Sequence, residues 1–171
     1  MKAGQNFGIL FFLLVIAQIV ICNYLQLTPY AIPTILPAMI LCLPLGIGTI
    51  GTMLIAFAAG LSVDWLSEGI LGLNAAAILP VAFIKRWVIR MFLGEDILTR
   101  NDSFTFRKNG VVKISAILLV STAVFLLIYT YLDGAGTRPF WFNAVRFTVS
   151  LAVNWVLSLV VVNLLMPDDR K

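Results

Sequence analysis

The stretch AFAAGLSVDWLSEGILGLN, residues 56–74, decides how the rest of the chain is interpreted. It opens as an apolar helix, acquires a carboxylate at Asp64, breaks at Ser-Glu-Gly and restarts at Leu-Gly. An acidic side chain inside an apolar run of membrane length is costly, so Asp64 is a candidate functional residue. Small residues precede it at steps of four and share one helix face: Thr52, Ala56 and Gly60. We therefore expect a neighbouring helix to approach closely along this face.

The composition is that of a membrane protein. Of the 171 residues, 61% are hydrophobic and 12% are charged, and the mean hydropathy is +1.01. A soluble domain has about 25% charged residues, so the composition excludes a soluble globular fold. No segment between the apolar runs is long enough for a separate domain. We predict one all-α integral membrane domain over residues 1–171.

Six apolar segments follow one another along the chain, separated by turns that contain Pro, Gly or charged residues. A membrane-spanning helix needs about 20 mostly apolar residues. The predicted transmembrane helices, packed in one bundle, cover residues 7–25, 33–47, 49–66, 71–92, 112–131 and 142–166. The second and third are short. The alternative is that residues 33–66 include a kinked or re-entrant element, which is tolerated where protein buries it.

The distribution of basic residues predicts the orientation. If the N-terminus is cytoplasmic, ten of the 12 Lys and Arg residues lie inside, and only Arg138 and Arg146 lie outside. Basic residues collect in cytoplasmic loops, so both termini are expected inside, and the net charge of +4 needs no nucleic-acid partner. A cytoplasmic basic face is predicted from Lys85, Arg86, Arg90, Arg107 and Lys108. The polar loop 94–110 is expected to tolerate neutralisation of its last two basic residues.

The residues needed for common catalytic and metal sites are missing. The chain has no His and two Cys, Cys22 and Cys42, both in apolar segments. A structural zinc site needs about four N or S ligands, and the Ser-His-Asp and Cys-His arrangements need a His. Asp64 and Glu68 lie one turn apart on a continuous helix, but no partner of matched pKa accompanies them. We therefore predict no catalytic residue, no metal and no cofactor.

A polar stripe runs along the last predicted helix at steps of four: Arg146, Ser150, Asn154 and Ser158. Such side chains form hydrogen bonds between membrane helices. Packing within the bundle, a ligand cavity and a subunit interface are all compatible with the stripe.

Two arrangements are open for the charges at the outer end. Intramembrane charges usually face the bundle interior and pair with one another, which predicts a polar cluster of Asp64, Glu68, Arg146, Ser150 and Asn154 in which Asp64 faces Arg146. In the alternative, Asp64 caps the turn before Leu71 through backbone N–H groups, and Arg146 extends towards lipid headgroups.

The stretch 56–74 resembles the rod shape-determining protein MreD family. That family has Gly-Leu-x-x-Asp at the end of one membrane helix, then a short turn, then Leu-Gly at the start of the next. The matching residues are Gly60, Leu61, Asp64, Leu71 and Gly72. Where the family often has His, this chain has Asn74. Length, number of helices and charge layout extend the resemblance over nearly the whole chain.

The resemblance implies a noncatalytic protein of the bacterial inner membrane. Such a protein binds the membrane protein MreC and belongs with the MreB filament and the rod-complex enzymes that elongate peptidoglycan. The motif residues would then form an interface with partner helices. The resemblance leaves open whether a small ligand occupies the bundle.

Two other functions remain as alternatives. Substrate-binding subunits of energy-coupling factor vitamin transporters have a similar size and number of spans, and the MreD family is thought to resemble their fold. They usually carry Ala-x-x-x-Ala in the first helix, whereas the first helix here has only Ala17. A channel or proton-coupled carrier needs a polar path through the membrane, and Asp64 lies near one end instead.

Overall fold

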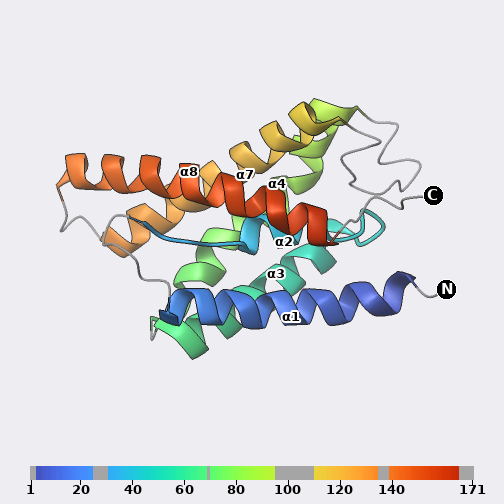
Figure 1. Cartoon of the computed structure of the whole chain (residues 1–171), viewed down its shortest axis with the longest axis horizontal. Helices are drawn as coiled ribbons and strands as arrows, with labels where there is room; N and C mark the ends of the chain where they lie inside the picture. Colours follow the sequence, from blue (N-terminus) through green and yellow to red (C-terminus); the bar gives the residue numbers. More distant parts are fainter. Residues whose placement is uncertain (1–2, 25–30, 69, 95–109, 135–138, 166–171) are drawn as a thin grey trace.

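The structure, a computed structural model, describes residues 3–24, 31–68, 70–94, 110–134 and 139–165 (Figure 1). All regular secondary structure in these ranges is helical. The helices are α1 (Ala3–Tyr24), α2 (Leu36–Leu41), α3 (Thr49–Val63), α4 (Leu73–Leu93), α7 (Val111–Gly134) and α8 (Phe140–Leu165), and a π-helix, η1 (Asp64–Glu68), continues α3. Apart from α2, each of these α-helices begins and ends within a few residues of a predicted helix.

The shortest α-helix, α2, lies at the centre of the bundle. Helices α3, α4, α7 and α8 pack in sequence, each against the next, and run in alternate directions (Figure 1). Helix α1 lies along one side of this group, and α2 lies between α1 and α8. Helix α2 contacts every other α-helix, and all six of its residues are buried. The fold is therefore built around a helix of fewer than two turns.

Three helical stretches are long and apolar enough to cross a membrane: Thr49–Ser67, Val111–Gly134 and Phe140–Leu165. The apolar stretch Gly8–Tyr24 is shorter, and α4 carries three basic residues in its last turns. Many large apolar side chains on the outer faces of the helices are exposed, including Phe12, Phe83 and Val156. Soluble monomers rarely expose such extensive apolar surface, so these faces are suited to lipid.

The predicted helix over residues 33–47 is wrong over most of its length. The backbone is not helical over residues 31–35, is helical only over Leu36–Leu41, and then turns until α3 begins. Proline explains both limits. Pro33 lacks a donor and favours an extended residue before it, Pro37 occupies the first turn of α2, where no donor is needed, and Pro44 prevents continuation of the helix.

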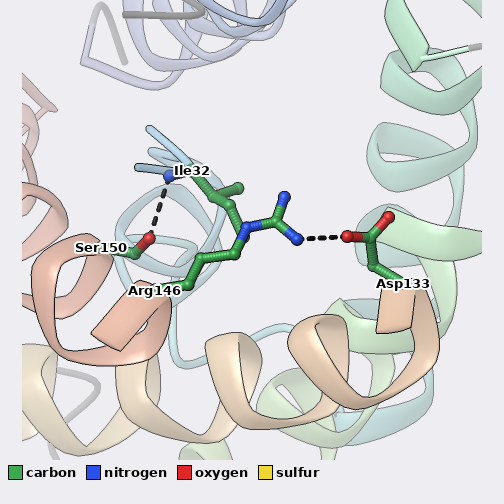
Figure 2. Close-up of polar contacts among 4 residues, drawn as sticks. All are labelled: Ile32, Asp133, Arg146 and Ser150. Carbon is green, nitrogen blue, oxygen red and sulfur yellow. Dashed lines mark hydrogen bonds and ion pairs between the residues drawn. The ribbon is translucent and has the colours of Figure 1, made fainter. Parts of the chain in front are cut away.

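Side chains of α8 replace the hydrogen bonds that a helix would have given residues 31–35. The Ser150 hydroxyl accepts from Ile32 N at 2.9 Å (Figure 2). The Asn154 amide accepts from Thr34 N at 2.8 Å and donates to Ile32 O at 2.8 Å. Both α8 side chains are fully buried. Of the interpretations left open for the polar stripe, these contacts support packing within the bundle.

The opposite side of this segment is held by α1. Gln18, which interrupts the apolar run of α1, is fully buried. Its side-chain oxygen accepts from Ile35 N at 2.7 Å, and its nitrogen donates to Pro33 O at 3.4 Å and to Cys22 Sγ at 3.0 Å. Residues 31–35 are thus fixed between two helices that are distant in the sequence.

Basic side chains of α4 bind the turn that follows α2. Lys85 Nζ donates to Leu43 O at 2.7 Å, and Arg86 donates to Leu45 O at 3.2 Å. These carbonyls follow the C-terminus of α2, where cations are favoured. Lys85 is only 2% exposed, so its assignment to a cytoplasmic surface is wrong, whereas Arg86 and Arg90 are exposed. The predicted loop residues Arg107 and Lys108 lie outside the described residues.

Replacement of Asn154 by Leu is expected to destabilise the protein strongly. Thr34 N and Ile32 O would lose their partners inside the bundle, and an unpaired buried group costs about 1–3 kcal/mol. The matched control is Thr148→Val on the same helix, because among the described residues the exposed Thr148 hydroxyl donates only to Ala144 O of its own helix. The thermal unfolding midpoint in detergent should fall clearly for Asn154→Leu alone. Equal midpoints for the two variants would show that Asn154 does not anchor the segment.

Candidate functional site

Residues 60–75 form a tight turn between α3 and α4, with a buried carboxylate at its centre. Asp64 is fully buried. Its Oδ1 accepts from Asn74 N at 2.8 Å and from Asn74 Nδ2 at 3.0 Å. Its Oδ2 accepts from Gly72 N at 3.0 Å and from Ala75 N at 3.1 Å. Four donors therefore surround the carboxylate.

Three of these donors are the free backbone N–H groups at the start of α4. The first turn of any helix leaves such groups without intrahelical partners, and the helix dipole there favours a negative charge. The cap usually comes from the residue just before the helix, but here it comes from the end of the preceding helix. Asp64 thus accepts from backbone N–H groups, as the alternative prediction expected, but from those at the start of α4 and not from the turn before Leu71. Gly72 makes this possible because its φ of 96° is left-handed.

Gly60 lets α3 approach this helix start. A Cβ atom on Gly60 would lie 2.7 Å from Ala75 Cα and 2.8 Å from Ala75 N, both well inside van der Waals contact. Thr52 and Ala56, on the same face of α3, are also buried, and α3 packs more extensively on α4 than on any other helix. The predicted close approach along the small-residue face is confirmed.

The motif residues divide into a buried set and an exposed set. Gly60, Asp64 and Asn74 are buried, and Asn74 at the His position of the family contributes both its backbone and its side chain to Asp64. Leu61 is partly buried, whereas Leu71 is 68% exposed. Most of the motif therefore builds the turn and is not available to a partner.

Apolar residues on the outside of the turn are the available surface. Trp65, Leu66, Ile70 and Leu71, which we call the apolar tip, are each more than half exposed. The π-helix η1 carries the first two, and Asn23 of α1 donates to Leu66 O at 3.3 Å. Of these four residues, only Leu71 belongs to the motif on which the predicted interface is based. The Ser-Glu-Gly break next to Trp65 was the signal for the others.

The predicted pairing of Asp64 with Arg146 is wrong. Arg146 forms an ion pair with Asp133 at the end of α7 (Figure 2), and the two side chains are 13% and 15% exposed. Helix α8 packs on α7 and not on α3, so the nearest carboxylate comes from its own hairpin. Asp133 was not predicted as the partner of Arg146, because it lies in a stretch whose Gly and Pro residues predict a turn.

The rest of the predicted polar cluster is also divided. Ser150 and Asn154 bond to the 31–35 segment, and the Glu68 side chain lies outside the described part of the chain. Ser158, the next member of the α8 stripe, is buried, and its hydroxyl has no hydrogen-bond partner in the described structure. The same holds for the hydroxyls of Ser121, Thr122 and Thr130 on α7.

The described residues contain no group of three or more His, Cys, Asp or Glu side chains that could hold a metal ion. No protein-family model, curated protein or solved structure matches the chain. The arrangement of the α3–α4 turn is therefore the main guide to function.

Substitution of Gly60 by Ala is expected to destabilise the α3–α4 hairpin. Ala usually stabilises a helix relative to Gly by about 0.5–1 kcal/mol, but here the added methyl meets the backbone of α4, and such overpacking costs about 1–3 kcal/mol. The control is Gly8→Ala in α1, where a Cβ meets nothing within 4 Å. Thermal unfolding in detergent should show a lower midpoint for Gly60→Ala and no loss for Gly8→Ala. A Gly60→Ala variant as stable as the wild type would contradict the close approach.

Proposed function

We propose that the chain is a noncatalytic inner-membrane component of the bacterial cell-shape machinery, similar to MreD, that binds MreC and supports peptidoglycan elongation in the rod complex. The observation that carries the proposal is the α3–α4 turn. Residues that match the family motif, Gly60, Asp64 and Gly72, meet there with Asn74 around one buried carboxylate. Motif residues that surround a buried carboxylate in this way preserve the shape of the turn.

The turn presents the apolar tip outside the bundle. Trp65 is 77% exposed and Leu71 is 68% exposed, although both are large apolar residues. Aromatic residues are enriched where proteins bind one another. The proposal therefore assigns the apolar tip to the contact with MreC, and the buried motif to positioning it.

The proposed topology has six membrane crossings with both termini in the cytoplasm. The second crossing is the segment from residue 31 to residue 48, which is part extended and part helical. It runs from the end of the bundle that holds the apolar tip to the end where α3 begins (Figure 1). An extended residue covers about 3.3 Å and a helical residue 1.5 Å, so the partly extended segment reaches further than a helix of equal length. This topology places the basic end of α4 in the cytoplasm.

Recovery of MreC with the intact protein from bacterial membranes tests the proposal. The double variant Trp65→Ala with Leu71→Ala should reach the membrane at normal abundance but recover several-fold less MreC and fail to support rod shape. Trp87→Ala is the matched control, since Trp87 is 76% exposed but lies towards the opposite end of α4. Reduced recovery with both variants would remove the apolar tip as the contact. Purification with a bound vitamin and no MreC would contradict the proposed function and favour the transporter subunit.

A further inference from the structure

The π-helix η1, which carries part of the apolar tip, is attached to two other helices. At the start of η1, the Asp64 carboxylate accepts from backbone N–H groups at the start of α4. Two residues later, the Leu66 carbonyl accepts from Asn23 Nδ2 of α1 at 3.3 Å. Trp65 lies between these two residues, and its side chain is 77% exposed. The chain on either side of Trp65 is therefore bonded to a neighbouring helix.

The amide of Asn23 bonds to both helices at once. An amide nitrogen carries two N–H donors. Asn23 Nδ2 donates to Ile19 O of its own helix at 3.1 Å and to Leu66 O of η1 at 3.3 Å. The bond to Ile19 O, one turn back in α1, limits the directions in which the amide can point. Helix α1 also packs against η1 (Figure 1), so the donor is presented from a fixed position.

The conformation of η1 explains why a donor is needed there. The last carbonyl groups of a helix have no partner within that helix, and Leu66 lies near the end of η1. A π-helix has more residues in each turn than an α-helix. The residues after Asp64 therefore point in other directions than they would if α3 continued as an α-helix. Such single π-turns are rare and are frequent at functional sites.

We propose that Asn23 is a positioning residue for the apolar tip: through Leu66 O it holds η1 in the π-helical form, and so it sets the direction in which Trp65 and Leu66 face MreC. Asn23 acts through Leu66 and does not need to contact MreC. The link to MreC rests on the proposed function, whereas the effect on Trp65 does not. Asn23 is exposed, and water can replace its bond to Leu66 O, so its loss should change the tip much more than the stability of the whole protein.

The direct test is the fluorine NMR signal of Trp65 in the intact, detergent-purified protein labelled with fluorinated tryptophan. The chain has four Trp residues, and the variant Trp65→Phe identifies the signal. Asn23→Ala removes the donor, and Asn23→Asp keeps the shape of the side chain but offers only acceptors when ionised. Both variants should shift or broaden the Trp65 signal while the other three signals and the thermal unfolding midpoint stay nearly unchanged.

The control is Asn163→Ala, which removes an exposed Asn of α8 and should leave the Trp65 signal in place. An unchanged Trp65 signal in both Asn23 variants would overturn the proposal. Equal changes in all four signals would also overturn it, because Asn23 would then support the whole fold and not the tip in particular.

Recovery of MreC from membranes separates this proposal from the proposed function. Asn23→Ala should reach normal abundance and recover several-fold less MreC, as should Trp65→Ala with Leu71→Ala. Loss with the double variant but normal recovery with Asn23→Ala would refute the positioning role in MreC binding. Normal recovery with both would refute the assignment of the apolar tip to MreC, and the Trp65 signal alone would then decide whether Asn23 positions the tip.

Discussion

Buried peptide groups that lack helical partners must find hydrogen bonds elsewhere in the protein, and this requirement organises the bundle around residues 31–47. Water cannot serve inside a membrane protein as it does at the surface of a soluble one. Gln18 from α1 and Ser150 and Asn154 from α8 bond the extended part, and Lys85 from α4 bonds the turn that follows α2. Each of these polar side chains is buried, and each would be costly without its backbone partner. The central segment and the polar residues around it therefore stabilise one another.

The same rule explains the turn between α3 and α4. Asp64 brings a carboxylate into the bundle, and the start of α4 brings N–H groups that no helix can satisfy by itself. The carboxylate accepts from three of the backbone N–H groups there, so each satisfies the other. At the other end of α4 the signs are reversed, since Lys85 and Arg86 bind carbonyl oxygens. Helix α4 is thus anchored at its N-terminal end by an acidic residue and at its C-terminal end by basic residues. The apolar tip lies at the first of these ends.

Apolar length and proline spacing predicted five of the helices, because a long hydrophobic run has few other stable arrangements in a membrane. They failed for residues 33–47, where the same apolar residues are buried in a segment that is helical only over Leu36–Leu41. Some of the contacts that stabilise this segment come from residues more than 100 positions away in the sequence. Asp64 was recognisable as a residue of functional interest because a carboxylate in an apolar run is energetically costly. Its hydrogen-bond partners were not recognisable from the sequence, because a similar depth in the membrane does not show that α8 packs on α7 and not on α3. Asp133 could have been found as the carboxylate closest in sequence to Arg146.

The backbone conformation of residues 31–41 in a lipid bilayer tests this account most directly. Solid-state NMR on labelled, reconstituted protein would give backbone chemical shifts and amide exchange rates for this segment. We expect non-helical shifts over residues 31–34, helical shifts over Leu36–Leu41, and slow exchange of the Ile32, Thr34 and Ile35 amides, which side chains of other helices bind. Continuous helical shifts from residue 33 to residue 47, or rapid exchange of those three amides, would contradict it.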